Sequence, residues 1–114
     1  MIHAEVLVTD KIVIFVTVGN RREARKIAKR LVNSRLAACV NLTAPVESIY
    51  WWKGKVEASG EVLLIIKTCR ELFAQVETEI RKLHTYKTPE IICLPIIEGS
   101  ADYLKWLDDS VRSA

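Results

Sequence analysis

Cysteine, histidine, glycine and proline are all scarce in this chain of 114 residues, which holds three, two, four and three of them respectively. No two cysteines form a C-x-x-C pair, so the sequence does not indicate a disulfide framework and favours reduced thiols. With so little glycine there is no glycine-rich phosphate loop and no G-x-S-x-G nucleophile motif. These absences exclude the most recognisable kinds of catalytic site.

Long apolar runs and strong net charge are also missing. The longest apolar run covers 91–97, far short of a membrane span, and the first residues lack the pattern of a signal peptide. A net charge of +3 is too small to indicate nucleic-acid binding by itself. We therefore expect a cytoplasmic protein with neither a membrane nor a nucleic acid as its partner.

The length suits one domain, 1–114, in which we interpret residues 1–10 as an N-terminal extension. Apolar periodicity predicts strands at 12–18, 36–42, 46–52, 56–68 and 90–97, and helices at about 20–34, 68–83 and 100–111. Asn20, Thr68 and Ser100 are the expected N-caps. The first strand is almost wholly apolar and fits burial on both sides, as in a parallel pair. The order β-α-β-β-α-β plus a helix predicts an α+β, ferredoxin-like sandwich.

The segment Tyr50–Lys55 places large aromatic side chains on both faces of an expected hairpin. Successive strand residues point to opposite faces, so Tyr50 and Trp52 lie on one side and Trp51 on the other. The following strand is apolar on both faces as well. Two main helices cover one face of such a sheet, so we expect a second copy of the chain to cover the other.

Five motifs in order resemble the CutA divalent-ion tolerance family over about residues 12–111. They are Ala37–Asn41, Tyr50–Lys55, Glu61 with Ile66–Thr68, the set His84, Tyr86, Pro89 and Glu90, and Tyr103–Leu107. The resemblance implies a ferredoxin-like homotrimer, with its hairpin reaching neighbouring subunits, and a role in the response to copper and other divalent metal ions. The family usually has His-Pro-Tyr where this chain has Thr85 between His84 and Tyr86.

Three residues are candidate metal ligands: His84, Glu90 and Cys69. A neutral imidazole suits copper, but a stable site needs three or four ligands, and His84 has no neighbour at ligand spacing. Cys69 follows the expected Thr68 cap, where a helix dipole can lower the thiol pKa, although a core thiol is the favoured interpretation. A histidine hydrogen-bonded within the fold is the favoured alternative. We predict no obligatory cofactor, and weak binding of copper or another divalent metal.

The remaining candidates belong to an inter-subunit cleft or interface. Glu61 and Lys67 share one strand face, and with Tyr86 and Glu90 they would line a cleft suited to an anion or to acid–base chemistry. A salt bridge at a subunit interface explains Glu61 and Lys67 equally well. The full predicted set is Tyr50, Trp51, Trp52, Glu61, Lys67, Tyr86 and Trp106. Without a nucleophile–base pair of recognisable spacing, we predict no enzymatic activity.

Basic residues crowd the first expected helix, at positions 21, 22, 25, 26, 29 and 30. No aromatic side chain lies among them, so base stacking is not supported, and we interpret them as a solvated face. Cys39 and Cys93 lie in apolar strands and are expected to be buried. Two alternatives to the metal-response trimer stay open: a PII-like signalling trimer that binds a small anionic ligand in its clefts, and a structural trimer that anchors another protein.

Overall fold

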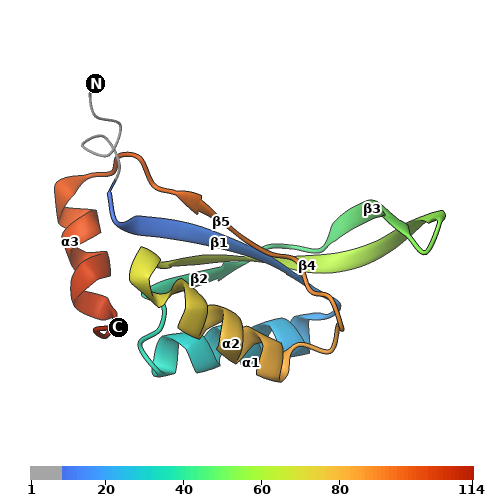
Figure 1. The fold of residues 1–114 in the computed structure, drawn as a ribbon, viewed down its shortest axis with the longest axis horizontal. Helices are drawn as coiled ribbons and strands as arrows, with labels where there is room; N and C mark the ends of the chain where they lie inside the picture. Colours follow the sequence, from blue (N-terminus) through green and yellow to red (C-terminus); the bar gives the residue numbers. More distant parts are fainter. Residues whose placement is uncertain (1–8) are drawn as a thin grey trace.

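The computed structural model describes residues 9–114, so residues 1–8 of the predicted N-terminal extension lie outside the described part (Figure 1). Its elements follow the predicted order, with one short 3-10 helix (η2) before the second α-helix. In chain order they are β1 (Lys11–Val18), α1 (Arg21–Asn33), β2 (Cys39–Leu42), β3 (Val46–Trp52), β4 (Lys55–Cys69), η2 (Arg70–Leu72), α2 (Phe73–Leu83), β5 (Ile91–Pro95) and α3 (Ala101–Ser110).

One sheet has the strand order β2-β4-β1-β5, and β3 pairs with the outer half of β4. The predicted ferredoxin-like topology is confirmed. The parallel pairing expected for β1 is wrong, because β1 runs antiparallel to both β4 and β5. Its unbroken apolar sequence has another cause: Ile14 and Val16 face the core, whereas Val13 and Phe15 lie half-buried on the opposite face.

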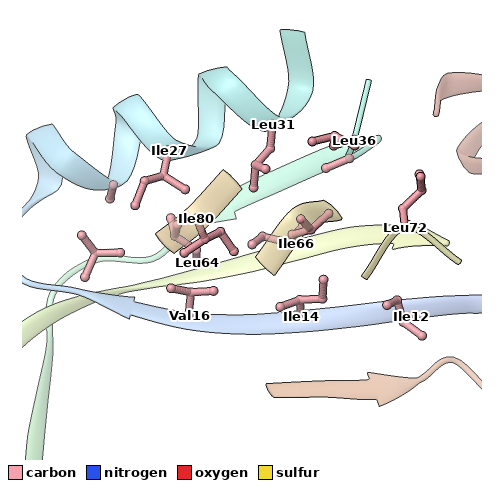
Figure 2. Packing of buried hydrophobic residues seen from close by; sticks show 14 of the residues in the cluster. Ile12, Ile14, Val16, Ile27, Leu31, Leu36, Leu64, Ile66, Leu72 and Ile80 are labelled. Atoms are coloured by element: carbon pink, nitrogen blue, oxygen red, sulfur yellow. The ribbon is translucent and has the colours of Figure 1, made fainter. Parts of the chain in front are cut away.

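The core lies between the sheet and the two main helices, α1 and α2, which cover the same face (Figure 1). Figure 2 shows Ile14 and Val16 of β1 and Leu64 and Ile66 of β4 directed towards the helices. Ile27 and Leu31 of α1 and Ile80 of α2 pack against them, and all seven side chains are fully buried. Burying a side chain of this kind contributes about 1.5–3 kcal/mol.

No helix among residues 9–114 covers the other face of the sheet. Leu63 and Ile65 of β4 are half-buried there, and on β5 the fractional exposures of Ile92 and Leu94 are 50% and 44%. The alternation predicted from the sequence is therefore confirmed. One set of apolar side chains forms the core, and the other set stays accessible in the single chain.

Helix α1 begins and ends with recognisable caps. The side chain of Asn20 accepts a hydrogen bond from the Glu23 amide at 2.8 Å, as predicted. At the other end Arg35 adopts a positive φ of 59°, and the amides of Arg35 and Leu36 donate to Val32 and Leu31. Because of this Schellman-type ending, the strand predicted at 36–42 begins only at Cys39, as β2.

The caps predicted at Thr68 and Ser100 are wrong in their side-chain contacts. Thr68 is fully buried within β4, and its hydroxyl donates to the Leu36 carbonyl at 2.7 Å. The following 3-10 turn has Cys69 as its N-cap residue, without a side-chain bond. Ser100 does stand at the N-cap of α3, but its side chain makes no capping bond either. A buried threonine satisfies its hydroxyl where the fold offers an acceptor.

The hairpin of β3 and β4 extends beyond the body of the domain (Figure 1). Its two-residue turn has positive φ at both positions, 51° at Lys53 and 79° at Gly54, which is the type I′ geometry that matches strand twist. Trp52 pairs with Lys55 immediately outside the turn. The turn therefore sets the register, and the register places Trp51 and Trp52 on opposite faces of an exposed ribbon.

Candidate functional site

A polar groove lies where the hairpin leaves the body of the sheet. Its walls come from the end of β1, from β3, from β4 and from the loop that follows α2. The lining residues are Thr17, Ser48, Ile49, Tyr50, Trp52, Ser59, Glu61, Tyr86, Lys87, Thr88 and Glu90. Five of the residues predicted from the sequence thus come together here: Tyr50, Trp52, Glu61, Tyr86 and Glu90.

Tyr86 and Glu61 are joined at the floor of this groove. The Tyr86 hydroxyl donates to Glu61 Oε2 at 2.9 Å, and Glu61 is buried. Burial, reinforced by the hydrogen bond to Glu61 and its charge, raises the pKa of Tyr86 to about 12. The phenol therefore stays protonated at neutral pH and acts as a hydrogen-bond donor, not as a base.

His84 is a hydrogen-bonded histidine of the fold. Its side chain is 0% exposed, its Nε2 lies 2.8 Å from the Thr17 carbonyl oxygen, and its Nδ1 accepts from the Tyr86 amide at 3.0 Å. Because Nδ1 accepts, Nε2 carries the proton and donates. No nitrogen lone pair is free in this arrangement. His84 as a metal ligand stays a prediction, and the geometry does not support it.

Glu23, which the sequence analysis did not single out, fixes the loop of His84 and Tyr86. Its carboxylate accepts from the Thr85 amide at 3.1 Å and from the Thr85 hydroxyl at 3.0 Å. A proline at position 85 would supply neither donor. Thr85, which stands where the family usually has proline, therefore donates two hydrogen bonds that a proline could not donate. The capping-box position of Glu23 was a visible signal, but it indicated a bond to Asn20 rather than to a distant loop.

Gly19 lies against the Tyr86 ring, and a Cβ at this position would lie 3.2 Å from the tyrosine hydroxyl oxygen. A side chain at position 19 would therefore crowd the phenol that bonds to Glu61. Three contacts fix the position of Tyr86 in the groove. Its ring lies against Gly19, its amide donates to His84 Nδ1, and the preceding residue, Thr85, donates two hydrogen bonds to the Glu23 carboxylate.

Lys67 does not reach the groove. Six residues along an extended strand separate it from Glu61 by roughly 20 Å, so the two cannot pair within one chain. Its ammonium donates instead to Asn41 Oδ1 at 2.5 Å. Trp106 lies on α3, at the opposite end of the sheet from the hairpin (Figure 1), and its ring is tilted by 37° to that of Tyr103, with centroids 5.5 Å apart. Roles for Lys67 and Trp106 at a subunit interface stay predictions.

The cysteines are distributed differently from the prediction. Cys69 is buried at the end of β4, and burial raises the pKa of its thiol to about 11, with the Lys11 charge only partly opposing it. The core position favoured for Cys69 is confirmed, and the alternative of a thiol pKa lowered by a helix dipole is wrong. Cys93 is exposed and Cys39 half-buried, because β5 is an edge strand and β2 is short.

Cys69 nevertheless belongs to the one metal-like cluster among residues 9–114. Its sulfur and carboxylate oxygens of Asp10 and Asp108 lie within 4.8 Å of one another. The Lys11 ammonium already bonds to both carboxylates, at 3.1 Å from Asp108. Burial alone lowers the pKa of Lys11, but these hydrogen bonds outweigh it and raise that pKa. A protonated thiol beside a resident ammonium does not fit a divalent cation.

These features define a class: a ferredoxin-like α+β chain with one open sheet face, a projecting aromatic hairpin and a polar groove. The family model described as "CutA1 divalent ion tolerance protein" matches residues 12–110. The divalent-cation tolerance protein CutA of Archaeoglobus fulgidus is 45% identical over 99 residues, which cover 87% of this chain and 96% of that protein. The chain therefore belongs to the CutA1 family, as its motifs predicted.

Solved structures of relatives agree with this assignment. The structure of CutA1 from Oryza sativa has a TM-score of 0.90 at 41% identity, covering 95% of this chain and 99% of that one. For the structure described as the periplasmic divalent cation tolerance protein CutA of Archaeoglobus fulgidus, the TM-score is 0.87 at 43% identity, covering 90% and 99%. The chain spans only 56% of the Arabidopsis thaliana relative, with which it is 46% identical over 102 residues.

These relatives contradict the cytoplasmic location that we predicted. The Arabidopsis thaliana and Oryza sativa proteins are named as chloroplastic, and the archaeal structure is described as periplasmic. Location therefore varies within the family, and a fold of this kind does not determine it. Within residues 9–114, no helix is both long and apolar enough to cross a membrane.

Proposed function

We propose that this chain acts as a homotrimer, without enzymatic activity, in the response to divalent metal ions. Membership of a divalent ion tolerance family supports the cellular role. The assembly rests on one observation: the sheet face opposite α1 and α2 is apolar, and the described part of the chain leaves it uncovered. Trp51 on the projecting hairpin is 74% exposed, and Ile92 and Leu94 on β5 are exposed as well. In a lone subunit, these side chains would leave a large apolar surface in water.

The hairpin gives a reason for a closed ring rather than a dimer through the sheet alone. It carries apolar side chains on both faces and lies beyond its own domain, where only another subunit would cover it. A hairpin that leaves one subunit and packs on the next makes a heterologous contact, which closes into a ring when the rotation fits. Sedimentation equilibrium tests this: a mass near three times 13.0 kDa is expected, and a monomer at micromolar concentration contradicts it.

We infer that the metal response does not depend on a resident metal ion. His84 offers no free lone pair, and in the cluster of Asp10, Cys69 and Asp108 both carboxylates are already paired with the Lys11 ammonium. Copper binding would then be weak and exchangeable, through exposed side chains such as Cys93 or Glu90. Calorimetric titration with copper(II) tests this, because a tight site of one ion per subunit would contradict it.

Binding of a small ligand in the groove is a second candidate function, favoured by the convergence of hydroxyl groups and carboxylates there. The part of the cleft that one chain supplies holds Glu61 and Glu90 but one ammonium, that of Lys87. This excess of carboxylates over ammonium groups disfavours the anionic ligand of the PII-like alternative and favours a neutral or cationic one. A thermal-shift screen of the trimer with amines and neutral polyols tests it. If a ligand raises the melting temperature of the parent but not that of the Glu61→Gln variant, its binding site is this groove.

A further inference from the structure

A second groove lies beside α1, on the side of the sheet that the helices cover. It has a volume of about 670 Å³ and runs beside the first two turns of α1, with Leu83 and Thr85 on its other wall. Four basic side chains line it: Arg22, Arg25, Lys26 and Lys29. Their spacing of three, four and seven residues places them on one side of the helix, along about 10 Å of its length.

The charges in this groove are not neutralised within the described chain. Between residues 9 and 114, no carboxylate lies within ion-pairing distance of these four side chains, although Arg30 on the same helix pairs with Glu79. The only acidic residue lining the groove is Glu23. Its carboxylate is withdrawn into the loop, bonded to Thr85, and its side chain is only 10% exposed. Four solvated cations therefore face a groove with almost no opposing charge.

We propose that this groove binds a small anion that carries several linked phosphates, either an inorganic polyphosphate or the phosphate tail of a nucleotide. Arginine guanidinium groups suit phosphate oxygens because they form two parallel hydrogen bonds, and lysine adds a point charge. The N-terminus of α1 lies at one end of the groove and adds the positive end of the helix dipole. The basic stripe is longer than one phosphate group, so a chain of phosphates matches it better than a single ion.

Other polyanions fit this groove less well. No aromatic residue lines it, so nothing is present to stack on bases, as single-stranded nucleic acid requires. An anionic membrane is disfavoured because the apolar face of α1, with Ile27 and Leu31, is buried in the core and cannot insert. This inference goes beyond the proposed function and does not depend on it.

Calorimetric titration of the intact protein with sodium tripolyphosphate, at neutral pH and low salt, tests the proposal. We expect one site per subunit and binding that weakens as salt screens the charges. The double variant Arg22→Gln, Lys26→Gln should weaken binding by about tenfold, equivalent to about 1.4 kcal/mol. The matched control Lys53→Gln, Arg70→Gln removes the same net charge from exposed sites outside the groove, and should bind like the unmodified chain.

Titrations with other compounds identify the chemical class of the ligand. Adenosine triphosphate binding as tightly as tripolyphosphate, with no binding of adenosine, assigns recognition to the phosphate tail; failure of the nucleotide to bind leaves inorganic polyphosphate as the source. The proposal is overturned if tripolyphosphate gives no binding, if citrate binds equally well, or if the control variant loses as much affinity as the groove variant. Tighter binding of a short single-stranded RNA through the same residues would also overturn it, in favour of nucleic acid. Circular dichroism checks that both variants melt like the parent, as exposed positions should.

Discussion

Glu23 and Thr85 lie 62 residues apart in the chain, yet the Glu23 carboxylate accepts both the amide and the hydroxyl hydrogen of Thr85. This pair ties the first turn of α1 to the loop that follows α2. The same loop carries His84, whose ring is fixed by the Thr17 carbonyl and the Tyr86 amide. The position of the Tyr86 phenol in the groove therefore depends on Glu23, His84 and Thr85, none of which lines the groove.

The first prediction concerns position 85. Thr85→Pro removes the amide and the hydroxyl that Glu23 accepts from, and should lower the free energy of unfolding by about 1–3 kcal/mol, the cost of a poorly satisfied, nearly buried carboxylate. Thr85→Ala removes only the hydroxyl and should cost about 0.5–1.5 kcal/mol. Urea denaturation measures both. Equal stability of the proline variant and the parent would show that the hydrogen bonds to Glu23 contribute nothing.

The second prediction concerns His84. His84→Ala leaves the Thr17 carbonyl and the Tyr86 amide without a partner, so unfolding should become easier by about 1–3 kcal/mol. Copper affinity, measured by calorimetry on the folded variant, should stay unchanged, because no ring nitrogen is free. A stable variant that no longer binds copper would establish His84 as the ligand after all.

Thiol labelling gives the third prediction. Cys93 is exposed and should react first with a disulfide reagent at neutral pH, whereas Cys69 should react only on unfolding. Cys69 is 2% exposed, and its thiol has a pKa of about 11, so little thiolate forms. Mass spectrometry of partly labelled protein identifies the site, and Cys93→Ser should abolish the fast phase. A fast phase that survives in Cys93→Ser would contradict the assignment.

The fourth prediction is a pH dependence at Tyr86. Its folded pKa of about 12 lies above the ordinary tyrosine value near 10. Because the folded pKa is raised, the protonated Tyr86 phenol contributes to the free energy of unfolding. This contribution is fully present below about pH 10 and is lost as the pH rises towards 12. Tyr86→Phe should remove this alkaline loss. Ultraviolet titration should show a tyrosine that ionises near pH 12 in the parent, and this step should be missing in the variant.

The fifth prediction concerns assembly. Trp52→Ala on the hairpin should weaken the trimer, since truncating a tryptophan that becomes buried costs about 3–5 kcal/mol. Lys55→Ala, the cross-strand neighbour of Trp52, is the control for changes in the hairpin itself and should leave assembly intact. Sedimentation over a concentration series measures both. If Trp52→Ala stays a trimer at the lowest concentration, the hairpin does not carry the interface.

Several features of the fold were predictable because their causes are local. Apolar alternation in β4, helical spacing in α1 and the Asn20 cap each depend on residues a few positions apart. The hairpin turn followed from Lys53 and Gly54, and the order of elements then left few possible topologies.

The candidate site depended on contacts between segments distant in sequence. Thr68 matched the pattern of a cap, but the Leu36 carbonyl offered its hydroxyl a buried acceptor, so β4 continued to Cys69. Cys93 resembled a core residue until β5 was placed at the edge of the sheet. Periodicity reveals which side chains share a face, because strand and helix geometry fix that locally. Only the tertiary structure decides what covers each face and which distant groups meet, and therefore the hydrogen-bond partners of the two His84 ring nitrogens, the thiol pKa of Cys69 and the partner of Glu23.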